Sequence, residues 1–213
     1  MSIITIASSK GGPGKTTVTM ILALMLTERK VPFALIDADP TLALSDWARD
    51  KCEPEIPCII ATKEDAMVDA AFAQDAKGLV VLIDTAGFDN PTTRGAITIA
   101  SHVLVPVGVG ASDIMQAEAT ARNIALFGKQ QRRPIDAKAL LNKQTRTRAS
   151  QFVFDEAHKL SISPLSATFG QRIAYPEISL TGVLPGPGAA KEEIDAVYDE
   201  LAGLGWFKIE EDE

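Results

Sequence analysis

Short runs of apolar residues alternate along the chain with longer segments whose apolar positions repeat at helical spacing. Each short run is apolar throughout rather than at every second residue, which is typical of strands buried on both faces of a parallel sheet. The pattern predicts strands at seven places: Ile3–Ala7, Phe33–Ile36, Ile59–Ala61, Leu79–Ile83, Val103–Val109, Ala139–Leu141 and Leu165–Phe169.

The segments between these runs predict helices. In the helix expected over Thr16–Arg29, Met20, Ala23 and Leu24 share one stripe. A second helix over Asp113–Phe127 and a last one over Ala189–Leu204 have their own apolar positions: Ile114, Ala117, Ala121, Ile124 and Ala125 in the former, and Ile194, Val197, Leu201 and Leu204 in the latter. Strands alternating with helices predict an α/β fold, a mostly parallel sheet of about seven strands with helices on both faces.

Length and composition favour a single domain. The chain has 213 residues, 46% of them hydrophobic, which is enough for one well-buried core. We expect this domain to span residues 1–205 and an acidic tail to follow over 206–213. The apolar runs are strand-sized and the N-terminus lacks signal-peptide features, so the pattern indicates a cytoplasmic protein without a membrane span.

A glycine-rich segment, SSKGGPGKTT at residues 8–17, lies between the first predicted strand and the first predicted helix. Glycines in such a turn let backbone N–H groups close around an anion, and the helix N-terminus adds partial positive charge. The segment therefore predicts a phosphate-binding loop and a P-loop NTPase. In this loop we expect Gly11, Gly12, Pro13 and Gly14 to cradle the phosphates, Lys15 to reach the β- and γ-phosphates, Thr16 to bind Mg²⁺, and Thr17 to contact the α-phosphate.

The loop departs from the strict pattern G-x-x-x-x-G-K-[ST] at its first position. Ser9 stands where that pattern has glycine, and the loop reads K-G-G-x-G-K-T instead. The variant form has a second lysine, Lys10, directly after the strand. An ordinary solvated loop residue is the alternative interpretation of Lys10.

Acidic residues follow the second and fourth predicted strands. Asp37 and Asp39 are two residues apart, a spacing that points both carboxylates to one side of an extended chain. Asp84 follows an apolar run, as a carboxylate supporting Mg²⁺ would, and Gly87 can offer its backbone N–H to a γ-phosphate. The alternative is that the first two acids cap a helix near residues 42–48 or form an Asx turn before Pro40.

The sixth predicted strand is followed by LLNKQT, at the place where related GTPases have N-K-x-D. Thr145 replaces the aspartate that would pair with guanine, which favours adenine with Asn142 as its contact. An Asn at a strand end that satisfies backbone groups is the competing interpretation.

Charge is unevenly distributed. The formal net charge is -7, but residues 129–148 contain seven basic residues and one acid, a local charge of +6. Residues 191–213 contain two lysines and nine acids, a local charge of -7 equal to that of the whole chain. The acidic C-terminal segment therefore masks a basic region in the overall composition.

The motifs KGGPGKTT, DADP, LIDTAG, SHVLVPV, FGQRIAYPEISLTG and AAKEEI occur in the order found in the ParA/MinD group of P-loop ATPases. The chain resembles its small ParA-type, ParF-like partition ATPases, and VirC1-like proteins are also similar. Thr41 stands where partition proteins usually have Gln, and TAG follows Asp84 where many have a proline-containing segment. Both differences lie around the γ-phosphate.

The resemblance implies a nucleotide switch that uses ATP, ADP and Mg²⁺. ATP with Mg²⁺ would join two subunits face to face, and slow hydrolysis, stimulated by a centromere-binding partner protein, would release the pair. In this group Lys10 reaches the partner's nucleotide and Asp39 positions the attacking water, while Asp37 and Asp84 act on the magnesium. With Lys15, Lys10 and Asp39 are the expected catalytic residues.

The resemblance also implies that the dimer binds DNA without sequence preference and is nucleoid-associated when ATP is bound. Candidate phosphate contacts are Lys143, Arg146, Arg148 and Arg172, with ordinary solvated charges as the alternative. An ATP-gated adaptor acting on a protein cargo is a second functional class, and a ligase relative stays open. A membrane-cycling ATPase is disfavoured because the C-terminus, EEDE, would be repelled by an anionic bilayer.

Overall fold

The computed structural model describes residues 2–9, 12–87 and 90–207. Within these residues one parallel sheet runs in the order β3-β2-β4-β1-β5-β6-β7. The strands are β1 (Ile3–Ile6), β2 (Phe33–Asp37), β3 (Cys58–Ile60), β4 (Val80–Asp84), β5 (His102–Val107), β6 (Asp136–Leu141) and β7 (Ser163–Pro164). The predicted α/β class and the parallel seven-stranded sheet are confirmed.

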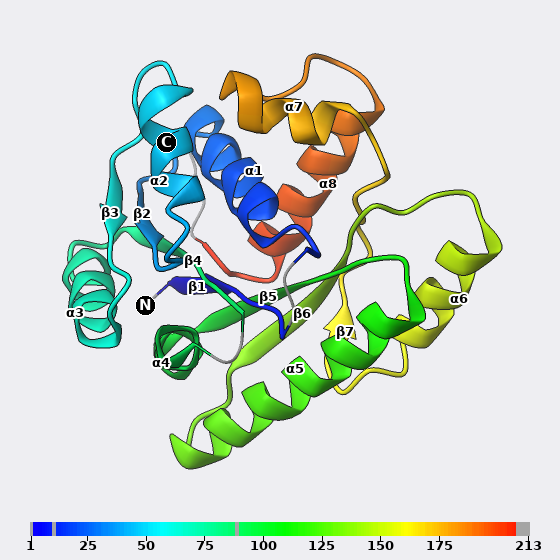
Figure 1. Cartoon of the computed structure of the whole chain (residues 1–213), viewed down its shortest axis with the longest axis horizontal. Coiled ribbons are helices and arrows are strands. Elements are labelled where there is room, and N and C mark those ends of the chain that lie inside the picture. The colour runs from blue at the N-terminus through cyan, green and yellow to red at the C-terminus, as the bar shows by residue number, and fades with distance from the viewer. Residues whose placement is uncertain (1, 10–11, 88–89, 208–213) are drawn as a thin grey trace.

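Helices cover both faces of this sheet (Figure 1). Helices α1 (Lys15–Glu28), α2 (Ala43–Asp50), α7 (Ala174–Thr181) and α8 (Ala189–Gly203) lie on one face. Helices α3 (Glu64–Asp75), α4 (Pro91–Ile99), α5 (Ala111–Gln130) and α6 (Arg148–Ala157) lie on the other. Each strand between them can therefore be apolar on both faces, which explains the continuous apolar runs.

Helix α1 is the central helix of its layer. Residues 18–26 are all buried, because the sheet lies on one side and α7 and α8 pack on the others. The predicted stripe of Met20, Ala23 and Leu24 is buried, but it is only part of a helix that is apolar all round. On α5 the predicted face is buried at Ala117, Ala121 and Ile124, whereas Ala125 is exposed.

The last strand is shorter and earlier than the predicted run at residues 165–169. Leu165 and Phe169 still donate backbone hydrogen bonds to the carbonyls of Ala139 and Leu141, at 2.8 and 2.9 Å. Between them, the carboxylate of Glu200 on α8 accepts the backbone N–H groups of Ser166 and Ala167, at 2.8 Å each. A continuing strand would direct the Ala167 N–H toward β6, because N–H groups alternate between the two sides of a strand, but Glu200 accepts it and β7 ends at Pro164.

The folded body extends beyond the predicted boundary at residue 205. Trp206 is fully buried and Phe207 is 3% exposed. The indole N–H of Trp206 donates to Asp136 Oδ2 at 2.7 Å, and the ring stacks on His102 at the start of β5. These contacts bring the end of the described chain to the amino ends of β5 and β6, whereas the glycine-rich loop follows the carboxyl end of β1. The remainder of the predicted tail, 208–213, lies outside the described residues.

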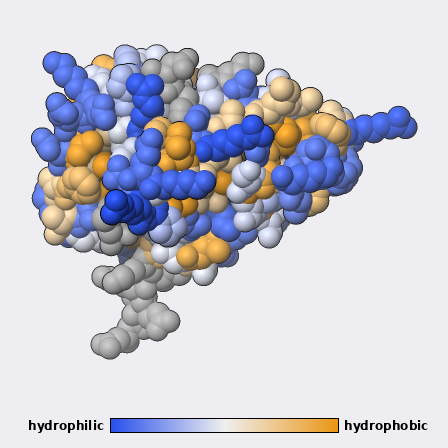
Figure 2. All heavy atoms as spheres, turned by 90° about the horizontal axis from the view of Figure 1, so that it is seen from below, coloured by the Kyte–Doolittle hydropathy of each residue, from blue (hydrophilic) through white to orange (hydrophobic). Residues whose placement is uncertain are grey.

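The surface on the α4 and α5 side mixes hydrophobic and hydrophilic side chains. Patches of hydrophobic residues are interrupted by hydrophilic ones on this face (Figure 2). Met115 and Leu126 on α5 are among the exposed apolar residues, at 73% and 51%. Among the described residues, none of the helices combines the length and the apolar composition needed to cross a bilayer.

Gly182 ends α7 in the left-handed conformation, with φ +66°. A Cβ atom there would lie 2.1 Å from the backbone carbonyl oxygen of Lys51, so neither the conformation nor the space suits another residue. We expect Gly182→Ala to lower the free energy of unfolding by about 2 to 3 kcal/mol in a urea titration. Gly203→Ala is the control, because a Cβ atom at Gly203 in α8 would meet nothing within 4 Å. Equal stability of the two variants would contradict the prediction.

Candidate functional site

The glycine-rich loop joins the end of β1, which lies between β4 and β5, to the start of α1. Gly14 has φ +98°, a conformation that glycine adopts without strain, and the amide nitrogen of Asn142 would lie 2.6 Å from a Cβ atom there. That amide donates to the carbonyl of Pro13 at 2.8 Å. The first N–H groups of α1 therefore face the loop with a fixed orientation, as an anion site requires.

Lys15 is the first residue of α1 and is 8% exposed. Its ammonium nitrogen lies 3.4 Å from the hydroxyl oxygen of Ser8. Burial lowers the pKa of Lys15, while the negative charges of Asp84 and Asp39 oppose that shift. A desolvated cation at a helix N-terminus is well placed to bind a phosphate group.

Thr16 and Asp84 meet beneath the loop. The hydroxyl of Thr16 donates to Asp84 Oδ2 at 2.7 Å, and the hydroxyl of Thr19 lies 3.3 Å from Asp84 Oδ1. The pKa of Asp84 is raised to about 7, chiefly by burial and also by the negative charge of the nearby Asp37, against the hydrogen bond from Thr16. A hydroxyl and a carboxylate oxygen next to a phosphate site are the hard oxygen donors that Mg²⁺ prefers, so these residues fit that ion.

Asp37 lies beside Asp84, because the two residues are paired in register on β2 and β4. Its carboxylate accepts the backbone N–H of Asp39 at 3.1 Å and that of Ser45 at 2.8 Å. Burial raises the pKa of Asp37, and these hydrogen bonds oppose the shift. The side chain therefore holds the start of α2, as the capping alternative predicted, while a role toward magnesium remains a prediction.

Asp39 makes an Asx turn, in which its Oδ1 accepts the backbone N–H of Thr41 at 2.9 Å. Unlike Asp37, it is half-buried and lines a cavity in front of Lys15 and Thr16. The structure thus separates the two acids of the DADP segment. Asp37 is buried and accepts backbone N–H groups, whereas Asp39 lines the cavity in which a phosphate would lie.

This cavity has a volume of about 940 Å³ and extends from the glycine-rich loop to two further segments. The first segment follows β6 and contributes Asn142, Lys143 and Thr145. The second precedes and enters α7, and it includes residues 170–173 and Tyr175. The cavity is large enough for a nucleotide whose phosphates occupy the loop end.

Two of the predicted DNA contacts lie at this cavity. The ammonium of Lys143 donates to the carbonyl of Gly12 at 3.1 Å, so it contacts the loop. Arg172 lines the cavity and pairs with Glu193 on α8. The other two candidates, Arg146 and Arg148, are exposed at the start of α6.

The adenine candidate Asn142 is 6% exposed and bonds to backbone groups on both sides. Its amide donates to Pro13, as above, and its Oδ1 accepts the N–H of Lys143 at 2.8 Å. This is the competing interpretation anticipated for a strand-end Asn, and Asn142 also lines the cavity. Contact with adenine stays a prediction.

Helix α5 holds the beginning of the glycine-rich loop. The hydroxyl of Ser9 donates to the Gln116 side chain at 2.6 Å, and its N–H donates to the Thr120 hydroxyl at 3.0 Å. The next two residues, Lys10 and Gly11, lie outside the described residues, so their predicted roles stay predictions. Gly87 is half-buried and its carbonyl accepts the N–H of Asn90, which begins the turn before α4.

Thr19 and Glu193 were not anticipated from the sequence. Thr19 follows Thr16 by three residues on α1 and therefore shares its helix face, a spacing that could have indicated it. Glu193 contacts residues more than 17 positions away, so nothing in the local pattern pointed to it.

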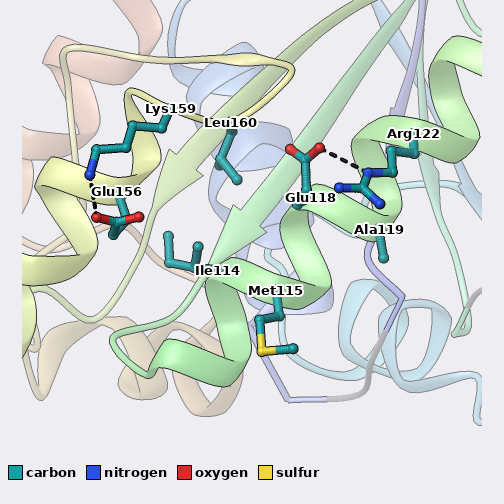
Figure 3. A pocket seen from close by; sticks show the side chains of 8 residues that line it. All are labelled: Ile114, Met115, Glu118, Ala119, Arg122, Glu156, Lys159 and Leu160. Carbon is teal, nitrogen blue, oxygen red and sulfur yellow. Dashed lines mark hydrogen bonds and ion pairs between the residues drawn. The ribbon is translucent and has the colours of Figure 1, made fainter.

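A second cavity, of about 470 Å³, lies between α5 and α6 (Figure 3). Ile114 and Leu160 contribute apolar surface. The charged side chains pair locally, Glu118 with Arg122 on α5, and Glu156 of α6 with Lys159 just after that helix. The charged groups around the glycine-rich loop instead come from separate elements, Lys15 from α1, Asp39 from the segment after β2 and Asp84 from the end of β4, and they lie close together. The loop cavity is therefore the candidate functional site.

A parallel sheet with a glycine-rich loop after β1, a lysine at the start of α1 and a buried aspartate at the end of β4 defines a P-loop nucleotide-binding domain. Residues 4–174 match the CobQ/CobB/MinD/ParA nucleotide binding domain, and the chain belongs to this family. The expected ParA/MinD relationship is confirmed.

Two relatives and one solved structure illustrate the range of similar proteins. Protein ParA of Rhizobium radiobacter is 34% identical over 114 residues, which are 53% of this chain and 51% of that protein. Maintenance of carboxysome distribution protein A of Halothiobacillus neapolitanus is 24% identical over 206 residues, 93% of this chain and 95% of that protein. The match to the Rhizobium protein thus spans about half of its length.

The solved structure is a plasmid partition protein from Borrelia burgdorferi bound to AMPPNP. It superposes with a TM-score of 0.75 at 14% identity, covering 95% of this chain and 99% of that chain. At this level of identity the likeness concerns the fold.

Proposed function

We propose that the chain is an ATPase that binds ATP with Mg²⁺ in the 940 Å³ cavity. The observation that carries the proposal is the convergence of Lys15, Thr16 and Asp84 at the start of α1. In this arrangement the first N–H groups of α1 and Lys15 hold the β- and γ-phosphates, and Thr16 with Asp84 holds the magnesium and its waters. Bound Mg²⁺ supplies positive charge that favours departure of the γ-phosphate.

In this proposal Asp39 orients the attacking water. It faces the cavity beside Lys15, and its Asx turn fixes the direction of the carboxylate. Gly87 follows β4 closely enough in sequence to offer its N–H to the γ-phosphate. Intrinsic hydrolysis is slow in this proposal, because a partner protein completes the site.

We further propose that ATP drives face-to-face pairing of two copies, with Lys10 of each reaching the other's nucleotide. The paired form binds DNA without sequence preference through exposed basic residues after β6, Arg146 and Arg148 among them. Hydrolysis stimulated by a centromere-binding partner resets the protein to the ADP form. The ParA relative and the partition-protein fold support this as the first candidate function.

A positioning ATPase with a protein cargo is the second candidate. It is favoured by the similarity to the carboxysome distribution protein, which covers 93% of this chain, whereas the match to the ParA relative covers 53%. Both candidates share nucleotide binding and pairing and differ in what the ATP-bound pair binds.

The experiment that tests the proposal has two arms. Light scattering with Mg²⁺ and AMPPNP measures pairing, and retention of nonspecific duplex DNA at several salt concentrations measures DNA binding. We expect a dimer and salt-sensitive retention. A protein that stays monomeric contradicts the pairing mechanism, and a dimer that ignores DNA at low salt favours the protein-cargo candidate.

Arg146 and Arg148 can be tested by charge reversal. We expect Arg146→Glu with Arg148→Glu to weaken DNA binding and to reduce the salt slope by about 4 for the pair, since each of the two copies loses two phosphate contacts and each contact contributes about 1. ATP affinity is expected to stay unchanged. Lys77→Glu is the control, because Lys77 is exposed beyond the end of α3, at the sheet edge away from the loop. Unchanged DNA affinity in the double variant removes these two residues from the interface.

A further inference from the structure

Glu193 on α8 accepts hydrogen bonds from three residues of the cavity wall formed by residues 170–175. Its carboxylate accepts the backbone N–H of Gly170 at 2.9 Å and the Nε–H of Arg172 at 2.9 Å. The hydroxyl of Tyr175 also donates to it. Gly170, Arg172 and Tyr175 all line the cavity, so one side chain outside the cavity holds three positions of its wall.

The fit around this carboxylate is close. A Cβ atom at Gly170 would lie 3.1 Å from Glu193 Oε1, tighter than ordinary contact. Tyr175 is 5% exposed and packs its ring on that of Phe169, at 5.0 Å between centroids. Burial alone would raise the pKa of Glu193, and the hydrogen bonds it accepts from Arg172, Tyr175 and Gly170 lower that pKa below its usual range.

The wall that Glu193 holds is joined to the phosphate loop by two backbone hydrogen bonds and one from a side-chain amide. Gln144 N–H donates to the carbonyl of Phe169 at 2.9 Å, and Gln171 N–H donates to that of Gln144 at 2.8 Å. Two residues before Gln144, Asn142 donates to Pro13 in the loop. The connection therefore runs from α8 through two cavity segments to the loop.

We propose that Glu193 is a positioning residue for the nucleoside part of the ligand, acting through the wall formed by residues 170–175 and the segment after β6. The inference rests on the proposed function, because it takes the ligand to be a nucleoside triphosphate. The phosphates are held at the start of α1, so the base and ribose extend toward the wall that Glu193 fixes. Glu193 contacts the wall rather than the nucleotide.

This inference gives Arg172 a role that differs from DNA contact. Its guanidinium donates to Glu193 through both Nε and a terminal nitrogen, a charge-assisted fork that keeps the side chain on the cavity wall. If Arg172 acts here, its replacement weakens ATP binding. If it acts on DNA, its replacement weakens DNA binding at saturating ATP and leaves ATP affinity unchanged.

The test compares two ligands, ATP and inorganic tripolyphosphate, each with Mg²⁺, in competition with a fluorescent ATP analogue. We expect Glu193→Gln to weaken ATP binding about tenfold, since an amide cannot accept all the hydrogen bonds that the carboxylate accepts. Tripolyphosphate has no nucleoside, so its affinity is expected to change less than about twofold. Glu192→Gln is the matched control, because Glu192 is the exposed neighbour on the same helix.

The outcomes are distinct. Equal weakening of both ligands, or no weakening of either, overturns the positioning role, because a merely structural defect does not separate the two affinities. If Glu193→Gln fails to fold, the affinities for ATP and tripolyphosphate are measured instead in Arg172→Gln, which removes the other partner of the ion pair. Wild-type protein that binds neither ligand overturns the proposed function itself, whereas wild-type binding with an unaltered Glu193→Gln profile overturns this inference alone.

Discussion

Lys15→Ala is expected to abolish nucleotide binding while the fold remains intact. The ammonium is 8% exposed at the start of α1, so a phosphate bound there would meet a desolvated cation. Losing such a charge contact costs about 3 kcal/mol or more, which corresponds to at least a 100-fold increase in Kd. Titration calorimetry with ATP and Mg²⁺ measures this directly.

Lys77→Ala is the matched control for this prediction, because it removes an equal charge from an exposed position beyond the end of α3. Circular dichroism establishes whether the Lys15→Ala variant keeps its secondary structure, since removal of Lys15 takes away a positive charge that interacts with the buried Asp84. A folded Lys15→Ala protein that binds ATP within threefold of wild type would remove Lys15 from the phosphate site. The assignment of the cavity would then fail with it.

The strands and the glycine-rich loop could be predicted from the sequence, because each depends on residues that are close together in the chain. Apolar runs identified the strands, since a strand buried on two faces must be apolar at each position. The loop at residues 12–17 was predicted because its glycine spacing and lysine occur together next to a strand. The pairing of Asp37 with Asp84 in register on neighbouring strands agrees with the expectation that carboxyl ends of strands converge.

The features that the sequence did not reveal depend on contacts between distant residues. Glu200 ends β7 early by taking two backbone N–H groups 33 and 34 residues away. Trp206 joins the folded body because its indole N–H donates to Asp136, 70 residues away, although an acidic stretch begins four residues after it in the sequence. Neither partner can be inferred from hydrophobic periodicity, which indicates only which side chains of a segment are buried and not which residues they contact.

Arg172 illustrates the same limit for function. From the sequence it was a candidate DNA phosphate contact, with an ordinary solvated charge as the alternative. The structure pairs it with Glu193, 21 residues away, on the wall of the cavity. The sequence shows that a residue is charged, but its role depends on which residues the fold places next to it.

Asp39→Ala and Asp39→Asn together test whether Asp39 positions the attacking water or only shapes the turn. The Asp39 carboxylate accepts the Thr41 N–H at 2.9 Å, and an asparagine Oδ1 can accept the same hydrogen bond without the negative charge. We expect both variants to bind ATP and to pair, with hydrolysis reduced about 100-fold or more, since positioned acid–base groups contribute that much. Phosphate release measures the rate, and light scattering measures the trapped dimer.

The comparison between the two variants separates charge from geometry. If Asp39→Asn hydrolyses ATP at the wild-type rate and only Asp39→Ala is slow, the Asx turn matters and the carboxylate does not act on water. If both hydrolyse normally, Asp39 has no catalytic role and another group must orient the nucleophile. Asp46→Asn is the control, because Asp46 lies exposed on α2 in an ion pair with Arg49, where loss of charge leaves the cavity unchanged.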